Sequence, residues 1–261
     1  MADGDLGVVL KATPLRESDL LVVLYTETHG RVAAVARGAR KSTRRFAGAL
    51  QLLVLGRYQL GRRPRGDLWG LDGADVEREW THLASDVFAV AHASYVAELV
   101  AGLMPVEMPE PHVLDLVVAL WESLAAHGPS PAALRAVELE LLEIAGHKPA
   151  LDACAACGEL SLEAGAMFDP TRGGAICKRC AATSRTAGVR PLEPGTLAYL
   201  RAVAAAGSPA AARALDADPG VAAADRSAGR DAVIAMVINL VGKPLKSLEY
   251  IAKLGAAGRR P

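Results

Sequence analysis

Four cysteines, spaced as two close pairs, impose the strongest constraint on what this chain can fold into. They read C-x2-C-x19-C-x2-C, and each pair forms a tight knuckle that presents two thiolates. Four thiolates complete a tetrahedral shell and leave no position for a substrate water, so the metal is expected to be structural. Iron in a rubredoxin-like site uses the same ligands and stays open as an alternative. We predict one structural Zn²⁺, held by Cys154, Cys157, Cys177 and Cys180.

The N-terminal residues and the hydropathy of the chain predict the cellular compartment of the protein. No stretch reaches the ~18 uncharged apolar residues that a membrane span needs. The N-terminal MADGDLGVVLKAT has acidic residues where a secretory signal places basic ones. We therefore expect a cytoplasmic protein with no membrane partner, whose thiols are reduced or bound to metal. The cysteine-containing subdomain spans about residues 150–185, with a short hairpin between the two pairs.

Short apolar runs separated by turn signals predict five strands near the N-terminus. Five such strands close most economically into an OB-fold barrel, which we place at residues 1–78. An SH3-like barrel has the same pattern, so the strands alone do not separate the two folds. The predicted strands are Leu6–Lys11, Leu20–Tyr25, Arg31–Arg37, Leu52–Leu60 and Leu68–Asp72.

The formal net charge of zero conceals a strong segregation of charge along the chain. Residues 31–65 hold ten basic and no acidic residues, whereas residues 66–150 hold three basic and fourteen acidic ones. A dense run of cations without anions is typical of a surface that binds a polyanion, and in a cytosol this is most often nucleic acid. The alternative is a solvated basic face without function.

The predicted strands and loops place these cations. Arg31 and Arg37 are six residues apart on one strand and therefore share a face. Phe46 and Tyr58 could stack on bases, but we expect both in the barrel core. Contacts would then be mainly to phosphates, with little sequence preference and a steep dependence on salt. The candidate DNA-binding residues are Arg31, Arg37, Arg40, Lys41, Arg44, Arg45, Arg62, Arg63 and Arg65.

From residue 79 to residue 261 the apolar period becomes helical, which makes the fold class α+β. A helix is predicted from about Glu79 to Pro105, followed by helices from about residue 109 to Gly128 and from Ser130 to Gly146. Later helices are predicted at Pro194–Ala206, Ala228–Val241 and Glu249–Leu254. Three glutamates of the third helix could suggest a di-metal site, but without Glu-x-x-His spacing we interpret them as a solvated face. They are Glu138, Glu140 and Glu143.

Several stretches of the sequence are distinctive as a set: GVVLKATPLRESDLLVVLYTETHGRVAAVARGARKS, RFAGALQ, CAACG, FDP, GG, CKRC and GKPLKSL. Together they resemble the RecO family of bacterial DNA-repair proteins, and the resemblance covers nearly the whole chain. It implies a non-enzymatic recombination mediator with an OB domain and a helical body that carries the zinc knuckles. Such proteins bind single- and double-stranded DNA, anneal complementary strands and help load the RecA recombinase onto single-stranded DNA.

The resemblance also implies partners and a location. Family partners are RecR and the acidic C-terminal tail of single-stranded-DNA-binding protein, and the expected location is the bacterial cytoplasm, on the nucleoid during repair. The six residues from Arg31 to Arg45 named above match the family's basic barrel stretch, and the four cysteines match its zinc ligands. The pocket for the acidic tail does not transfer onto named residues. The positive charge for it is expected from Lys243, Lys246 and Lys253.

Two other functions compete with this one. A zinc-containing, sequence-specific DNA-binding regulator would need a basic recognition helix beside the knuckles, but residues 151–190 carry a net charge of only +1. A metal-dependent nuclease or deaminase would need an open metal site or an acidic cluster, and no H-x-E motif accompanies the cysteines.

Overall fold

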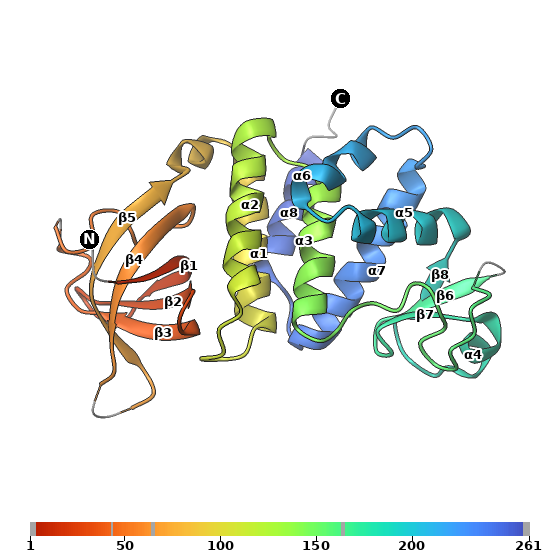
Figure 1. Cartoon of the computed structure of the whole chain (residues 1–261), viewed down its shortest axis with the longest axis horizontal. Coiled ribbons are helices and arrows are strands. Elements are labelled where there is room, and N and C mark those ends of the chain that lie inside the picture. Colours follow the sequence, from red (N-terminus) through yellow and green to blue (C-terminus); the bar gives the residue numbers. More distant parts are fainter. Residues whose placement is uncertain (1–3, 43, 64–65, 163–164, 258–261) are drawn as a thin grey trace. The chain divides into compact units, whose positions relative to one another are not determined.

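The computed structural model describes residues 4–42, 44–63, 66–162 and 165–257. Its N-terminal part is a closed five-stranded barrel (Figure 1). The strands are hydrogen-bonded in the order β1-β2-β3-β5-β4, and β4 pairs back onto β1. Only β3 and β5 run parallel; the other pairs are antiparallel. This Greek-key order is that of an OB fold, so the predicted barrel type is confirmed. The strands are β1 (Asp5–Pro14), β2 (Leu20–Thr26), β3 (Gly30–Ala36), β4 (Val54–Gly61) and β5 (Trp69–Glu79).

Strict alternation along β3 shows why these residues form a barrel. Val32, Ala34 and Ala36 are buried, whereas Ala33 and Val35 between them are partly exposed. Successive side chains of a strand point to opposite faces, so one set fills the barrel core and the other faces outward. The core also contains Tyr58, Trp69 and Phe46.

The chain divides into two compact units, and the division differs from the predicted boundary between residues 78 and 79. We name Met1–Pro129 together with Leu245–Pro261 the barrel unit, and Ser130–Pro244 the cysteine unit. The barrel unit therefore contains the first helices after the barrel and also the C-terminal helix.

The helices of the barrel unit follow β5 after a short 3-10 turn. Asp86 caps the first of them, because its carboxylate accepts hydrogen bonds from the N–H groups of Phe88 and Ala89. Glu98 of that helix accepts hydrogen bonds from Ser247 Oγ at 2.6 Å and Ser247 N at 3.0 Å, which fixes the start of the C-terminal helix. The elements are η1 (Thr81–Ser85), α1 (Val87–Leu103), α2 (Pro111–His127) and α8 (Lys246–Ala257).

The predicted start of the first helix near Glu79 is wrong. Strand β5 continues to Glu79, which lies opposite Val54 of β4, and α1 begins only at Val87. Trp80 and Leu83 are buried as expected of an apolar stripe, but they lie at and within η1. The strand ends where the helical periodicity begins, and α1 starts later because residues 81–85 form η1 and Asp86 caps the helix.

In the cysteine unit, the other helices pack around one central helix, α3 (Pro131–Ile144). The side chain of Ser130 caps it, as predicted, by accepting a hydrogen bond from Ala133 N at 3.0 Å. Helix α3 contacts α5, α6 and α7. A small sheet in the order β7-β6-β8 carries the cysteine knuckles. The remaining elements are β6 (Ala166–Asp169), β7 (Gly174–Ile176), α4 (Lys178–Thr183), β8 (Arg190–Leu192), α5 (Pro194–Ala205), α6 (Pro209–Ala212), η2 (Arg213–Asp216) and α7 (Ala223–Val241).

Burial of α3 corrects the interpretation of its glutamates as a solvated face. Glu138 is fully buried and forms an ion pair with Arg135, which is 4% exposed. Glu143 does lie at the surface, where it pairs with Lys148. Because neighbouring helices cover α3, two of its charged residues are enclosed and pair with each other within the core.

Within the described residues, no helix combines the length and apolar character that crossing a membrane requires.

Candidate nucleic-acid interface and metal centre

The four cysteines lie together in the cysteine unit, and their geometry fits one metal ion. Their sulfur atoms all lie within 4.8 Å of one another, and the Sγ atoms of Cys157 and Cys177 are 3.9 Å apart. A tetrahedron with zinc–sulfur bonds of about 2.3 Å has edges of about 3.8 Å. The predicted four-thiolate cluster is therefore confirmed as a group that can hold a metal ion.

The electrostatics of the cluster also favour bound metal. Burial alone raises the pKa of the Cys154 thiol, but the backbone N–H groups of Cys177, Ala156 and Cys157 outweigh it and lower this pKa to about 6. The pKa of the Cys180 thiol is raised to about 12, first by its hydrogen bond with the Cys157 thiol and then by that with Cys177 and by burial. Thiolates packed this closely repel one another, and a divalent cation removes that repulsion.

Arg179 supplies a further positive charge at the exposed side of the cluster. It lies on α4, two residues after Cys177, and its Nη2 atom is 3.7 Å from Cys157 Sγ. Cys157 is the exposed ligand, whereas Cys154 and Cys177 are buried. The guanidinium therefore offsets negative charge where the cluster meets solvent.

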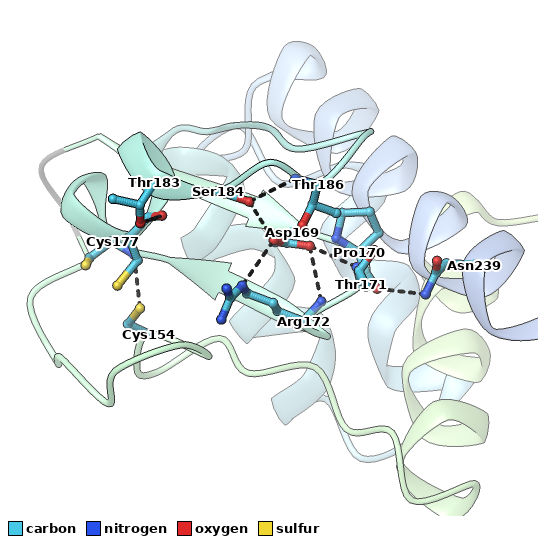
Figure 2. A network of polar contacts seen from close by, with 11 residues as sticks. Cys154, Asp169, Pro170, Thr171, Arg172, Cys177, Thr183, Ser184, Thr186 and Asn239 are labelled. Carbon is cyan, nitrogen blue, oxygen red and sulfur yellow. Dashed lines mark hydrogen bonds and ion pairs between the residues drawn. The ribbon is translucent and has the colours of Figure 1, made fainter.

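Asp169 connects the hairpin to the segment that follows α4 (Figure 2). Its Oδ1 accepts hydrogen bonds from the N–H groups of Thr171 and Arg172 at 3.0 and 3.1 Å, which closes the turn after β6. Its Oδ2 accepts from Ser184 Oγ at 3.3 Å and lies 3.5 Å from Arg172 Nε. The carboxylate is completely buried, so every one of its contacts is made inside the protein.

The substitution Asp169→Asn is expected to destabilise the cysteine unit by about 1.5–3 kcal/mol, because hydrogen bonds to a charged group contribute about that much. The amide keeps one acceptor for the turn but loses the ion pair with Arg172. The midpoint of denaturant unfolding measures the change. Asp152→Asn is the matched control, since Asp152 also pairs with an arginine but is 89% exposed, and it should change stability by less than about 0.5 kcal/mol. Equal effects of the two substitutions would contradict the role assigned to Asp169.

The loop after β3 carries four of the predicted DNA-binding residues, and all four side chains are exposed. Asp19 holds the start of the loop, because its Oδ1 accepts a hydrogen bond from Gly38 N at 2.8 Å. This hydrogen bond is the main cause of the lowered pKa of Asp19, which keeps the carboxylate ionised. Lys41 forms an ion pair of 3.1 Å with Glu17, and both partners remain largely exposed. The four residues are Arg40, Lys41, Arg44 and Arg45.

The other predicted cations differ in how accessible they are. Arg37 is exposed, but Arg31 is half-buried, and burial lowers its pKa. Arg31 Nε has no hydrogen-bond partner among the described residues. Arg62 and Arg63, in the loop between β4 and β5, form ion pairs with Glu107 and Asp72. Arg65 lies outside the described residues.

A groove of about 800 Å³ joins two of these cations to apolar side chains on the outside of the barrel. It lies where the β1–β2 loop, β3 and the β4–β5 loop meet, and loops in these positions bind oligonucleotides in OB folds. An added Cβ at Gly70 of β5 would lie 1.9 Å from Arg63 Nε, so the absence of a side chain there lets the arginine lie across the strand. The lining residues are Leu15, Arg16, Asp19, Val35, Arg37, Arg63, Leu68 and Trp69.

The groove contains residues that sequence reasoning missed. Phe46 and Tyr58 are buried in the barrel core, as expected. Trp69 was not recognised as part of a surface site, although it follows the arginine-rich turn directly. Leu15 and Leu68 are 44% and 41% exposed and line the same groove as three arginines. Their position in the β1–β2 and β4–β5 loops was the available signal, because these loops are binding segments of the predicted fold.

An OB barrel with cationic loops, followed by helices that carry a four-thiolate centre, places the chain among OB-fold proteins with a metal-binding helical part. Residues 1–79 match the family described as Recombination protein O N terminal, and residues 84–249 match Recombination protein O C terminal. The chain belongs to the RecO family of DNA repair proteins.

Three relatives named DNA repair protein RecO align with most of this chain, and the alignments cover most of each relative as well. The chain is 42% identical over 250 residues to the DNA repair protein RecO of Anaeromyxobacter dehalogenans strain 2CP-C, covering 95% of each chain. It is 32% identical over 251 residues to the DNA repair protein RecO of Myxococcus xanthus, covering 96% of this chain and 97% of the relative. For that of Geobacter sulfurreducens, the identity is 39% over 174 residues, covering 67% and 71%.

Proposed function

We propose that this RecO-family protein is a non-enzymatic mediator that anneals complementary DNA strands and helps load the RecA recombinase onto single-stranded DNA. The observation that carries the proposal is the cationic groove between the β1–β2 and β4–β5 loops of the barrel. Its arginines suit phosphates, and its apolar side chains suit unstacked bases. The nine cations predicted from the sequence, Arg65 included, are proposed as DNA-binding residues, with Arg16 added.

In the proposed mechanism, cations on the barrel neutralise phosphates of two strands and lower the repulsion that keeps the strands apart. Base pairing then supplies the specificity, so the protein needs no sequence readout of its own. The metal, proposed to be Zn²⁺, stabilises the cysteine unit and takes no part in chemistry. The proposed partners are RecR and the acidic tail of single-stranded-DNA-binding protein, in the bacterial cytoplasm and on the nucleoid during repair.

The structure gives little support to the alternative of a zinc-containing, sequence-specific regulator. Helix α4, which follows Cys177, has only six residues, and its Arg179 faces the cysteine cluster. A recognition helix needs several side chains free to reach base edges in the major groove.

The three lysines proposed to attract the acidic tail of single-stranded-DNA-binding protein belong to different units. Lys246 and Lys253 lie on α8 of the barrel unit, and Lys243 lies in the cysteine unit.

Annealing of complementary strands coated with single-stranded-DNA-binding protein tests the proposed function directly. The protein should accelerate fluorescence-detected annealing, and R37A/R63A should reduce the acceleration roughly 25-fold at about 0.1 M salt, because two phosphate contacts are lost at about fivefold each. K148A/R230A is the matched control, since it removes two exposed cations of the cysteine unit. No acceleration by the wild-type protein, or equal losses in the two double variants, would refute the proposal.

A further inference from the structure

The indole of Trp69 is the centre of a small group of charged and aromatic side chains beside the groove. The Arg62 guanidinium carbon lies 4.3 Å from the centre of the indole, over its face. Trp69 Nε1 donates a hydrogen bond of 2.8 Å to Glu107 Oε1, and Glu107 Oε2 pairs with Arg62. Glu107 thus holds both the ring and the cation that covers it.

The barrel fixes Glu107 in this position. Glu107 lies in the segment between α1 and α2, and its N–H donates a hydrogen bond of 2.9 Å to Arg31 O of β3. At Gly30 an added Cβ would lie 2.4 Å from Met108 O, so only glycine permits this close approach of the segment. Hydrogen bonds from Trp69 first, and then from Arg62, lower the pKa of Glu107, so the carboxylate is ionised at neutral pH.

A nucleotide of single-stranded DNA would use the same two partners. Guanidinium groups bind carboxylates and phosphates with the same paired geometry. The face of an indole stacks on bases of any sequence. Trp69 is part of the barrel core and only 6% exposed, whereas the Arg62 side chain that covers its indole is 62% exposed and can move into solvent.

We propose that Trp69 and Arg62 form a binding site for one nucleotide of single-stranded DNA, and that Glu107 occupies the phosphate position of this site in the DNA-free protein. On binding, Arg62 leaves Glu107 for a phosphate, and a base takes the place of the guanidinium on the indole. Glu107 therefore weakens binding and limits it to ligands that supply both groups. This inference rests on the proposed DNA-binding function of the barrel.

The substitution Glu107→Gln tests the competition with phosphate. The amide oxygen can still accept from Trp69 Nε1, but the charge that holds Arg62 is lost. Affinity for a dT oligonucleotide is expected to rise about fivefold, because Arg62 no longer has to leave a carboxylate to reach the phosphate. The log–log salt slope should stay within about 0.3 of the wild-type value, since Arg62 contacts the phosphate in both proteins. Glu77→Gln is the matched control, because Glu77 pairs with Arg57 on the barrel and its loss changes the net charge equally.

Two further measurements locate the effect. In an Arg62→Ala background, Glu107→Gln should no longer raise the affinity, because the coupled partner is absent. The oligonucleotide should quench intrinsic fluorescence, and this quenching should be lost in Trp69→Phe, since Trp80 and Trp121 are buried against each other.

The outcomes separate this inference from the proposed function. If the wild-type protein binds dT and Glu107→Gln binds no more tightly than Glu77→Gln, the Glu107 contact does not compete with DNA, although the proposed function stands. Quenching that persists in Trp69→Phe would exclude the stacking site. If the wild-type protein shows no salt-dependent binding of dT at all, the proposed function fails and this inference fails with it.

Discussion

Replacing Arg40, Lys41, Arg44 and Arg45 with alanine is expected to weaken binding of single-stranded DNA by roughly two to three orders of magnitude at about 0.1 M salt. Each phosphate contact on a single strand contributes about 0.7 to the slope of log affinity against log salt, which is about fivefold in affinity at this salt concentration. All four side chains are exposed, on the loop that follows the groove residue Arg37. The loss should be the same for unrelated sequences, and a salt titration of fluorescence anisotropy measures both quantities.

A matched variant separates this loop from charge in general. K148A/R185A/R230A/K243A removes four exposed cations of the cysteine unit and changes the net charge equally. It should leave the salt slope within about 0.5 of the wild-type value. The Lys41–Glu17 ion pair does not alter the expectation, because an exposed pair contributes only about 0–1 kcal/mol. An unchanged affinity and slope in the loop variant would remove this loop from the DNA-binding surface.

The second large effect is expected in the metal centre, where Cys157→Ser should reduce bound zinc from about one ion per chain to below about 0.1. Binding of structural zinc by four-ligand peptides contributes about 10–16 kcal/mol near neutral pH, and folding of the surrounding segment depends on it. Cys157 is the exposed ligand, so its replacement disturbs packing less than replacement of Cys154 or Cys177 would. Elemental analysis of protein purified under reducing conditions measures the metal, and thermal unfolding measures the loss of stability.

The adjacent substitution Ala156→Ser controls for the added hydroxyl group, because it keeps all four thiolates and should keep the metal. Cys157→Ser should still bind DNA within about threefold of wild type, since the proposed binding residues lie in the barrel unit and the cysteines in the cysteine unit. A Cys157→Ser protein that retains one metal ion per chain would contradict the proposed site. So would metal-free wild-type protein, and iron instead of zinc would change the metal without changing the ligands.

The parts of the fold that were predictable are those encoded by neighbouring residues. The cysteine spacing predicts the cluster, because each pair forms its knuckle locally. Alternation along β3 and the turn signals predict the strands, and Ser130 followed by Pro131 predicts the start of α3 within a residue. In each of these cases tertiary contacts agree with the local pattern.

The errors arose where a distant partner decides the outcome. Strand β5 reaches Glu79 because β4 pairs with it, and Trp80 and Leu83 lie at and within η1 although their spacing continues into α1. Glu138 is enclosed because other helices cover α3, and no local pattern distinguishes it from the exposed Glu143. Likewise, the contact between Trp69 and Glu107 joins positions 38 residues apart, through a loop whose placement depends on the fold.

The return of the C-terminal helix to the barrel unit has a consequence for how the protein is made. Helix α8 packs on α1, and Glu98 holds its first turn, yet the whole of Ser130–Pro244 is synthesised between the two partners. A ribosome releases the chain from its N-terminus, so the barrel can form early, but α1 must wait with one side uncovered until translation is almost complete. Nascent chains arrested shortly before residue 246 should therefore expose an apolar surface that the finished protein conceals, and should depend most on chaperones at that stage.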